Sequence, residues 1–154
     1  MRRILTDRYQ GADPTDEAAA MNDVLLHREL TDLIIKAFYR VYNTLGYGFL
    51  ERVYENALAH ELRTLGLKVQ QQVPINVHYQ GVRVGEYFGD LLVEDKVLLE
   101  LKSCEELCDK HATQLLNYLN ASPIEVGLLF HFGEKPTIKR KIQTNDRKKS
   151  LSSS

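Results

Sequence analysis

The chain has 154 residues, of which 44% are hydrophobic and 27% are charged, and its formal net charge at pH 7 is −1. This is the composition of an ordinary globular protein, and the length suffices for one hydrophobic core. The near-neutral charge excludes a protein that coats nucleic acid by bulk electrostatics, since such domains are distinctly basic. Any contact with nucleic acid must therefore come from a local patch.

The two ends of the chain differ from its interior. Residues 1–23 carry acidic side chains and no apolar block of signal-peptide length, so we expect a flexible extension on a cytoplasmic protein. No stretch approaches the ~20 apolar residues of a bilayer-spanning helix, which argues against a membrane partner. Residues 143–154 lack apolar anchors and are expected to form a disordered tail. One folded domain, residues 24–142, is therefore predicted.

Two helices are predicted in the first half of the chain. Over residues 25–45 apolar side chains recur at steps of three and four, as the buried face of an amphipathic helix requires. Gly46 and Gly48 end this pattern, because glycine adopts the backbone angles of a tight helix exit. The same period returns over residues 50–65, and Gly66 is the expected stop.

A run of strands follows the second helix. Gln80-Gly81 supplies the turn of a hairpin, and Pro74 marks either a break or an edge strand because proline lacks an N–H. The strands expected at residues 90–93 and 97–101 are almost continuously aliphatic, which predicts that they lie in the centre of the sheet with both faces covered. The expected strands are residues 68–73, 75–79, 82–88, 90–93 and 97–101.

The remaining segments complete an α/β layered domain. The helical period returns over residues 105–121, where Pro123 ends it, and residues 126–132 form another buried strand. Residues 136–142 form an edge strand or a loop. Basic residues are concentrated between Lys135 and Lys149, where they either follow a phosphate backbone or belong to a solvated tail.

Three charged residues interrupt the two aliphatic strands: Asp90, Glu100 and Lys102. Side chains two residues apart on a strand share a face, so Glu100 and Lys102 emerge together, with the Leu101 carbonyl between them. If the connecting turn centres on Asp95, Asp90 lies opposite Glu100, with the Cβ atoms ~5 Å apart.

Opposed carboxylates repel each other unless one is protonated or a cation lies between them. Mg²⁺ prefers oxygen ligands and retains several waters, so Asp90, Glu100 and the Leu101 carbonyl suit an open Mg²⁺ site, with Mn²⁺ as a substitute. Lys102 would lower the pKa of the attacking water or stabilise charge on phosphorus. The alternative is an ion pair between Lys102 and either carboxylate that only ties two strands together.

The run from Gly48 to Tyr54 resembles the G-x-x-E-x-x-Y signature of the GxxExxY proteins, a family of the PD-(D/E)XK nuclease superfamily. The similarity continues through residues 72–75, 90–94, 100–102 and 111–118. It implies a restriction-endonuclease-like core, with a central mixed sheet flanked by helices and two of those helices N-terminal. One departure is Gly89, which stands where the superfamily has a proline before the aspartate.

The resemblance implies a role for each acidic and basic residue of the cluster. Asp90 and Glu100 would bind the metal, and Lys102 would assist the attacking water. Glu51 would be a further acid near the metal, acting through a water. A simpler account of Glu51 is that the helix dipole favours a carboxylate in the first turn.

Four more residues are candidates for the rim of the site. The spacing of Gln114 and Tyr118 resembles the Q-x-x-x-Y motif of RecB-type nucleases, whose residues border the active site and the nucleic-acid strand; one helical turn separates the two, so both can face one cleft. Tyr54 either orients Glu51 through a hydrogen bond or belongs to the core. His111 either contacts phosphate or a metal-bound water, or is structural.

The sequence thus predicts a metal-dependent nuclease that hydrolyses phosphodiester bonds in DNA or RNA. The alternative is a catalytically silent nuclease-fold module that binds nucleic acid or a protein partner, since the domain carries little with which to choose a target. A homodimer is compatible with both, because small nuclease cores often pair to cut two strands.

Overall fold

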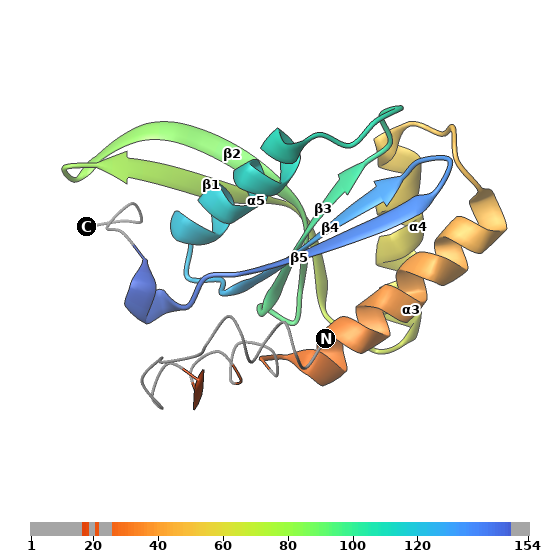
Figure 1. Cartoon of the computed structure of the whole chain (residues 1–154), viewed down its shortest axis with the longest axis horizontal. Helices are drawn as coiled ribbons and strands as arrows, with labels where there is room; N and C mark the ends of the chain where they lie inside the picture. The colour runs from red at the N-terminus through yellow and green to blue at the C-terminus, as the bar shows by residue number, and fades with distance from the viewer. Residues whose placement is uncertain (1–16, 19–20, 22–25, 149–154) are drawn as a thin grey trace.

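The structure is a computed structural model that describes residues 17–18, 21 and 26–148. It is a three-layer α/β domain in which two helices cover one face of a five-stranded sheet and one helix covers the other (Figure 1). The elements are α3 Arg28–Leu45, α4 Glu51–Thr64, β1 Val69–Tyr79, β2 Val82–Val93, β3 Val97–Lys102, α5 Asp109–Asn120, β4 Val126–Phe132, β5 Pro136–Ile142 and the short 3₁₀ helix η1 Asn145–Arg147.

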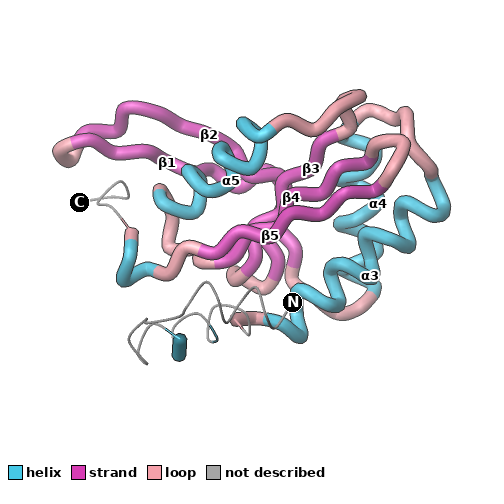
Figure 2. The backbone as a smooth tube through the Cα atoms, viewed as in Figure 1, coloured by secondary structure: helices cyan, strands magenta, loops and turns pink. Residues whose placement is uncertain are grey.

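The five strands lie in the order β1-β2-β3-β4-β5. Strands β3 and β4 are parallel, whereas every other neighbouring pair is antiparallel. The connection between β3 and β4 passes through α5 (Figure 2). The aliphatic strand β3 occupies the centre of the sheet, as predicted. Strand β1 is an edge strand that runs through Pro74 without a break, which confirms the second of the two alternatives for that proline.

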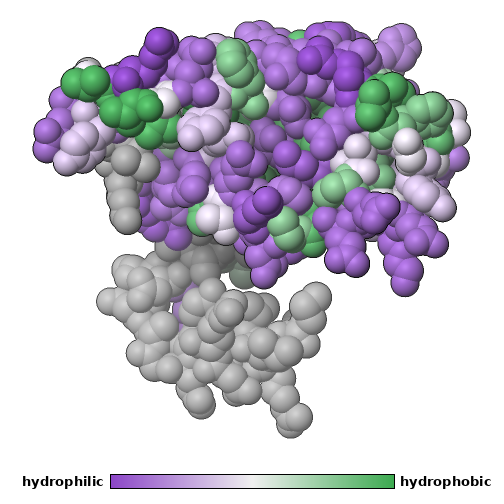
Figure 3. All heavy atoms as spheres, turned by 90° about the horizontal axis from the view of Figure 1, so that it is seen from above, coloured by the Kyte–Doolittle hydropathy of each residue, from purple (hydrophilic) through white to green (hydrophobic). Residues whose placement is uncertain are grey.

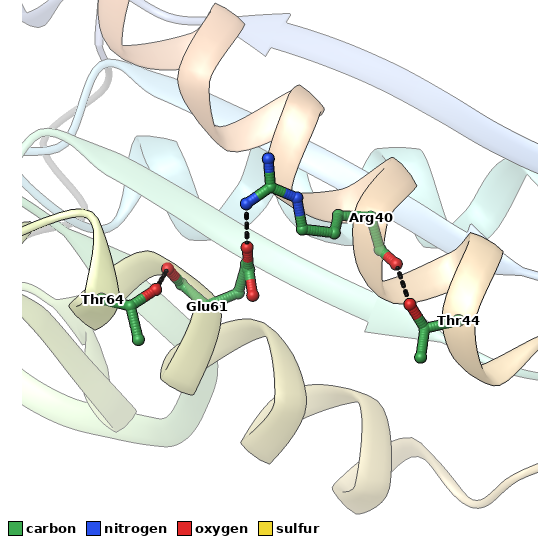
Figure 4. Close-up of polar contacts among 4 residues, drawn as sticks. All are labelled: Arg40, Thr44, Glu61 and Thr64. Carbon is green, nitrogen blue, oxygen red and sulfur yellow. Dashed lines mark hydrogen bonds and ion pairs between the residues drawn. The ribbon is translucent and has the colours of Figure 1, made fainter.

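Helices α3 and α4 pack on the sheet through an aromatic cluster. Phe38 of α3 stacks on Phe130 of β4 with ring centroids 4.4 Å apart, and Tyr54 of α4 stacks on Phe132 at 4.0 Å. A polar clasp holds the two helices together: Arg40 donates a hydrogen bond to Glu61 at 2.6 Å (Figure 4). Thr44 and Thr64 each donate to a carbonyl of their own helix beside this pair (Figure 4). The clasp joins the last turn of α4 to α3.

The predicted start of the third helix is wrong. Helix α5 begins at Asp109, four residues later than predicted, because residues 105–108 form an irregular segment. Both cysteines lie in the segment before α5 and are exposed free thiols.

Residues 143–148, the described part of the expected tail, form hydrogen bonds with the rest of the domain. The ammonium group of Lys148 donates hydrogen bonds to the carbonyls of Ser122 and Ile124, at 2.7 and 2.6 Å, and thereby fastens the segment to the turn after α5. Arg140 likewise donates to the Leu26 carbonyl, so part of the basic concentration serves the fold. The expected flexible extension lies almost entirely outside the described residues, as does the end of the tail.

Gly89 occupies a position of β2 where a side chain does not fit. A Cβ atom there would lie 2.5 Å from Cδ1 of Leu98 and 3.3 Å from Cδ1 of Ile75, both in the packed layer beneath α5. We therefore expect Gly89→Ala to lower the free energy of unfolding by about 1–3 kcal/mol in urea titrations, as overpacking does.

The same substitution in a Leu98→Val background provides the control for this prediction. Valine lacks the methyl group that the new Cβ would meet, so the cost of Gly89→Ala should shrink relative to Leu98→Val alone. An equal cost in both backgrounds would show that the contact with Leu98 is not the cause.

Candidate functional site

The candidate site lies where β2 and β3 separate. The backbone pairing of these strands ends at Leu91 and Leu99, and Asp90 and Glu100 stand at the next position. Their side chains replace the missing ladder bonds: the Leu101 N–H donates to Asp90 Oδ2 at 2.8 Å, and the Asp90 N–H donates to Glu100 Oε1 at 3.3 Å. The two carboxylates therefore lie together, as the expected turn around Asp95 requires.

Strand β1 has an irregularity opposite Asp90. Gln72 has a φ of 54° and takes no part in the pairing, although Gln71 pairs with Leu91 and Val73 pairs with Gly89. Gln71 points to α4, whereas Ile75 packs beneath α5, so the alternation of side chains along β1 shifts at Gln72. Such irregularities are frequent next to active sites, where they re-aim side chains.

Glu55 of α4 holds this irregularity in place. Its side chain is only 3% exposed and accepts hydrogen bonds from the amides of Gln71, at 2.8 Å, and Gln72, at 2.5 Å. The Gln72 amide also lies 3.4 Å from Asp90 Oδ1. Asp90 is therefore held at one oxygen by the Leu101 N–H and at the other by Gln72, and Gln72 is held by Glu55.

Sequence reasoning missed Glu55 and Gln72. Glu55 lies one helical turn after Glu51, between the buried residues Tyr54 and Leu58, where a carboxylate requires a partner. Counting residues from the turn at Asp95 placed Asp90 opposite Glu100, but it cannot identify Gln72, because the register of β1 depends on a separate turn. The sequence therefore indicates Glu55 and Gln72 only weakly.

Burial controls the protonation of the two carboxyl groups. Glu100 is 5% exposed, and burial, followed by the charge of Asp90, raises the pKa of Glu100 to about 9. Burial also raises the pKa of Asp90; the Leu101 N–H opposes this effect, and the charge of Glu55 adds to it. Without a cation, the pair therefore retains a proton at neutral pH. A bound cation would stabilise the ionised form of both carboxylates, so the pair would release this proton.

Lys102 lies on the same face of β3 as Glu100, and its charge lowers the pKa of Glu100 against the effect of burial. Among the ion pairs within residues 26–148, none joins Lys102 to Asp90 or Glu100. The described residues therefore do not contain the alternative arrangement, an ion pair between Lys102 and either carboxylate that only ties two strands together. The ammonium group is near the carboxylates without being neutralised by direct contact.

Glu51 and His111 lie at the outer side of the cluster. Glu51 is exposed in the first turn of α4, and its charge raises the pKa of both Asp90 and Glu100. His111 lies in the first turn of α5; burial, then the charge of Lys102, lowers the pKa of His111, whereas Glu51 raises it. The charge of Glu51 thus acts on the carboxylate pair and on His111, whose ring contacts Cys108 at the start of α5.

Tyr54 does not orient Glu51. Its ring is fully buried, and its hydroxyl donates to the Gly46 carbonyl at 2.7 Å and accepts from the Phe49 N–H at 3.1 Å. These bonds close the loop between α3 and α4. Of the two alternatives for Tyr54, the structure shows the position in the core, and Tyr54 affects Glu51 only by fixing the loop that precedes it.

Gln114 and Tyr118 line one pocket, as their spacing predicted. The pocket has a volume of 580 Å³ and lies between α5 and the β1–β2 hairpin. Burial, followed by the charge of Glu100, raises the pKa of Tyr118 to about 12, so this ring lies near the carboxylates. Gln114 shares this pocket with Tyr118, and its role at the site stays a prediction.

The chemistry of the cluster fits a hard divalent cation in an open site. Two carboxylates are available, and the Leu101 carbonyl faces β2 because the N–H and C=O of one strand residue point to the same neighbour. Within the described residues no group of three or more His, Cys, Asp and Glu side chains could hold a metal, which argues against a closed zinc site. Mg²⁺ needs only one or two carboxylates, since it keeps several waters.

Comparisons with known proteins add a family match. The family model of the PD-(D/E)XK nuclease superfamily matches residues 28–143, a span that includes all residues of the cluster. The crystal structure of SSO0001 is similar with a TM-score of 0.49 and 17% identity, and the similarity covers 80% of this chain and 62% of that chain. No curated protein matches the sequence. In the described part of the chain, no helix is long and apolar enough to cross a membrane.

The raised pKa of Glu100 predicts a pH dependence of stability in the absence of metal. The folded state keeps a proton between the unfolded pKa of 4.5 and the folded pKa of about 9, and the unfolded state loses it. Stability is therefore greatest below the lower value and falls as pH rises through this window. We expect a loss of about 1–4 kcal/mol between pH 5 and pH 8 in urea titrations with EDTA.

Two variants test whether Glu100 is the origin of that dependence. Glu100→Gln should flatten the pH profile, because the side chain no longer titrates. Glu29→Gln removes an exposed carboxylate at the start of α3 and should leave the profile of the wild type unchanged. A steep profile in Glu100→Gln would assign the effect to another group.

The hydrogen bonds of Glu55 predict a structural cost for its removal. Glu55→Ala leaves the amides of Gln71 and Gln72 without this acceptor in a buried setting, so we expect a loss of about 1–3 kcal/mol in the free energy of unfolding. Glu61→Ala removes another carboxylate of α4 that has a partner; it should cost under about 1 kcal/mol because the Arg40 side chain of this ion pair is 68% exposed and returns to water. Equal costs would contradict the network.

Proposed function

Because the chain belongs to the PD-(D/E)XK nuclease superfamily, we propose that it is a metal-dependent nuclease that hydrolyses phosphodiester bonds in DNA or RNA. The observation that carries the proposal is the pair Asp90 and Glu100: a half-buried and a buried carboxylate that meet beside an ammonium group with no ion pair to either. Nucleases of this superfamily generally use divalent metal ions. The donor set favours Mg²⁺, with Mn²⁺ as a substitute.

Asp90, Glu100 and the Leu101 carbonyl would hold the ion, and Glu51 would reach it through a water. The ion would polarise the phosphate and lower the pKa of a bound water. The protein prepares this site in advance: the Leu101 N–H and Gln72 fix the two oxygens of Asp90, and the Asp90 N–H fixes Glu100. Each carboxylate is therefore oriented before the substrate arrives.

The reaction is an in-line displacement at phosphorus. Water attacks, the bond from phosphorus to the leaving oxygen breaks, and the products are a phosphate monoester and a hydroxyl group. Lys102 stabilises the negative charge that develops on the phosphate oxygens or on the attacking water, and the low exposure of the neighbouring Glu100 strengthens this effect of the Lys102 ammonium group. His111, on which the charges of Lys102 and Glu51 act, adds a polar group from the first turn of α5.

We also assign the chain to the GxxExxY proteins, because each letter of the motif has a physical role in this structure. Gly48 has a φ of 107°, which favours glycine. Tyr54 closes the same loop through its hydroxyl bonds to Gly46 and Phe49. Together they place Glu51 in the first turn of α4, at the edge of the carboxylate pair.

Cleavage assays on single- and double-stranded DNA and RNA test the proposed activity. We expect Mg²⁺- or Mn²⁺-dependent cleavage by the wild type. Asp90→Asn and Glu100→Gln should each reduce it at least ~100-fold, and Lys102→Met about 100- to 1,000-fold, because a preorganised charge is lost at the transition state. Product formation on denaturing gels provides the measurement.

Matched substitutions on α3 control for changes in net charge. Glu29→Gln and Lys36→Met alter exposed residues of that helix and should leave the rate unchanged. Undiminished cleavage in both Asp90→Asn and Lys102→Met would end the proposal. Metal binding by calorimetry without any cleavage would instead favour a module that only binds its partner.

A further inference from the structure

The β1–β2 hairpin extends as an arm beyond the rest of the sheet (Figure 1). Figure 3 shows hydrophobic residues gathered at the end of the molecule that this arm forms. Its large apolar and aromatic side chains are unusually exposed: Tyr79 62%, Val82 62%, Val84 61%, Tyr87 46% and Phe88 49%. An exposed group of this kind marks a surface that contacts another molecule.

One side of the arm forms a groove with α5. The groove has a volume of 580 Å³, and its lining includes Val77 and Tyr87 from the arm and Lys110, Gln114, Asn117 and Tyr118 from the helix. Pockets of about 300–1,000 Å³ enclose one small ligand. The groove therefore has room for a nucleotide or two and cannot enclose a stacked duplex.

Tyr87 presents an aromatic ring on the arm side of this groove. The ring lies over Gly85, where an added Cβ would be 3.4 Å from it, and contacts Tyr118 with centroids 5.4 Å apart and planes tilted by 38°. Tyr118 is 7% exposed, whereas Tyr87 is 46% exposed. One side of the Tyr87 ring is thus supported by the protein, and the rest remains accessible for stacking.

Tyr118 is the groove residue that relates this surface to the carboxylate cluster. Tyr118 lies between Tyr87, which it contacts, and Glu100, whose charge acts on its hydroxyl. The lining contains one basic residue, Lys110, and no carboxylate, together with two side-chain amides that can bond the edges of bases. A negatively charged strand that carries aromatic bases matches this surface in charge and in shape.

We propose that the groove between the β1–β2 arm and α5 binds single-stranded nucleic acid beside the scissile phosphate, with one base stacked on Tyr87. This inference rests on the proposed nuclease function, because it makes the groove the part of the site that holds the substrate strand. Base stacking on an aromatic side chain tolerates any sequence. Substrate choice then depends on strandedness more than on sequence.

A fluorescence titration tests the stacking directly. The chain contains no tryptophan, so Tyr87→Trp introduces a single reporter. We expect its emission to be quenched by single-stranded DNA or RNA in EDTA, where no cleavage occurs. Tyr79→Trp places the same reporter on the exposed end of β1, outside the groove, and should respond little. Parallel DNA and RNA oligonucleotides of one sequence distinguish the two sources of the strand.

Binding by anisotropy of labelled oligonucleotides supplies a second readout. We expect Tyr87→Ala to weaken binding of single strands about 10-fold or more, Tyr87→Phe to retain it, and Tyr79→Ala to bind like the wild type. A blunt duplex of the same sequence should bind more weakly than the single strand. Unchanged binding by Tyr87→Ala, equal quenching at both tryptophan positions, or preference for the duplex would each overturn the inference.

The two proposals fail separately. If the wild type does not cleave but single strands bind through Tyr87, the groove stands and the nuclease function falls. If cleavage depends on Asp90 and Lys102 but neither binding nor quenching depends on Tyr87, the nuclease function stands and the groove inference falls.

Discussion

Two carboxyl groups that meet between two strands place the strongest constraint on this protein. Glu100 is buried and Asp90 is half-buried, so water cannot fully solvate both charges. The protein offsets this cost in two ways. Backbone N–H groups bond one oxygen of each carboxylate, and the raised pKa of Glu100 lets the metal-free pair keep a proton. A cation between the two carboxylates would offset their repulsion, which explains why two acidic residues stand together in the centre of the sheet.

The irregularity at Gln72 links the site to the rest of the fold. A left-handed residue within a strand carries conformational strain, and here Glu55 supplies the hydrogen bond that holds it. The same irregularity shifts the alternation of side chains along β1. Ile75 and Val77 consequently face α5, and the arm presents its groove to that helix. One local departure from regular strand geometry therefore both orients Asp90 and builds the surface next to it.

The sequence predicted the central features because they depend on local patterns. The turn between the two aliphatic strands determines their register, so Asp90 could be placed opposite Glu100 by counting residues. Glu55 and Gln72 could not be found in this way, because their contact joins α4 to β1 across the core and depends on one positive φ angle. Tyr54 was ambiguous for a related reason: a buried tyrosine needs a partner, and only the fold reveals which carbonyl supplies it.

The charge of the protein also constrains how it can hold a polyanion. The net charge is −1, and the candidate site contains Asp90, Glu100, Glu51 and Glu55. Much of the basic segment near the C-terminus is used in internal contacts, as Lys148 and Arg140 illustrate. Nonspecific attraction of phosphates is therefore weak, so affinity must come from a cation at the carboxylates and from contacts that do not depend on charge. An exposed aromatic ring beside those carboxylates supplies the second kind of contact, because stacking on a base is insensitive to the negative charge around it.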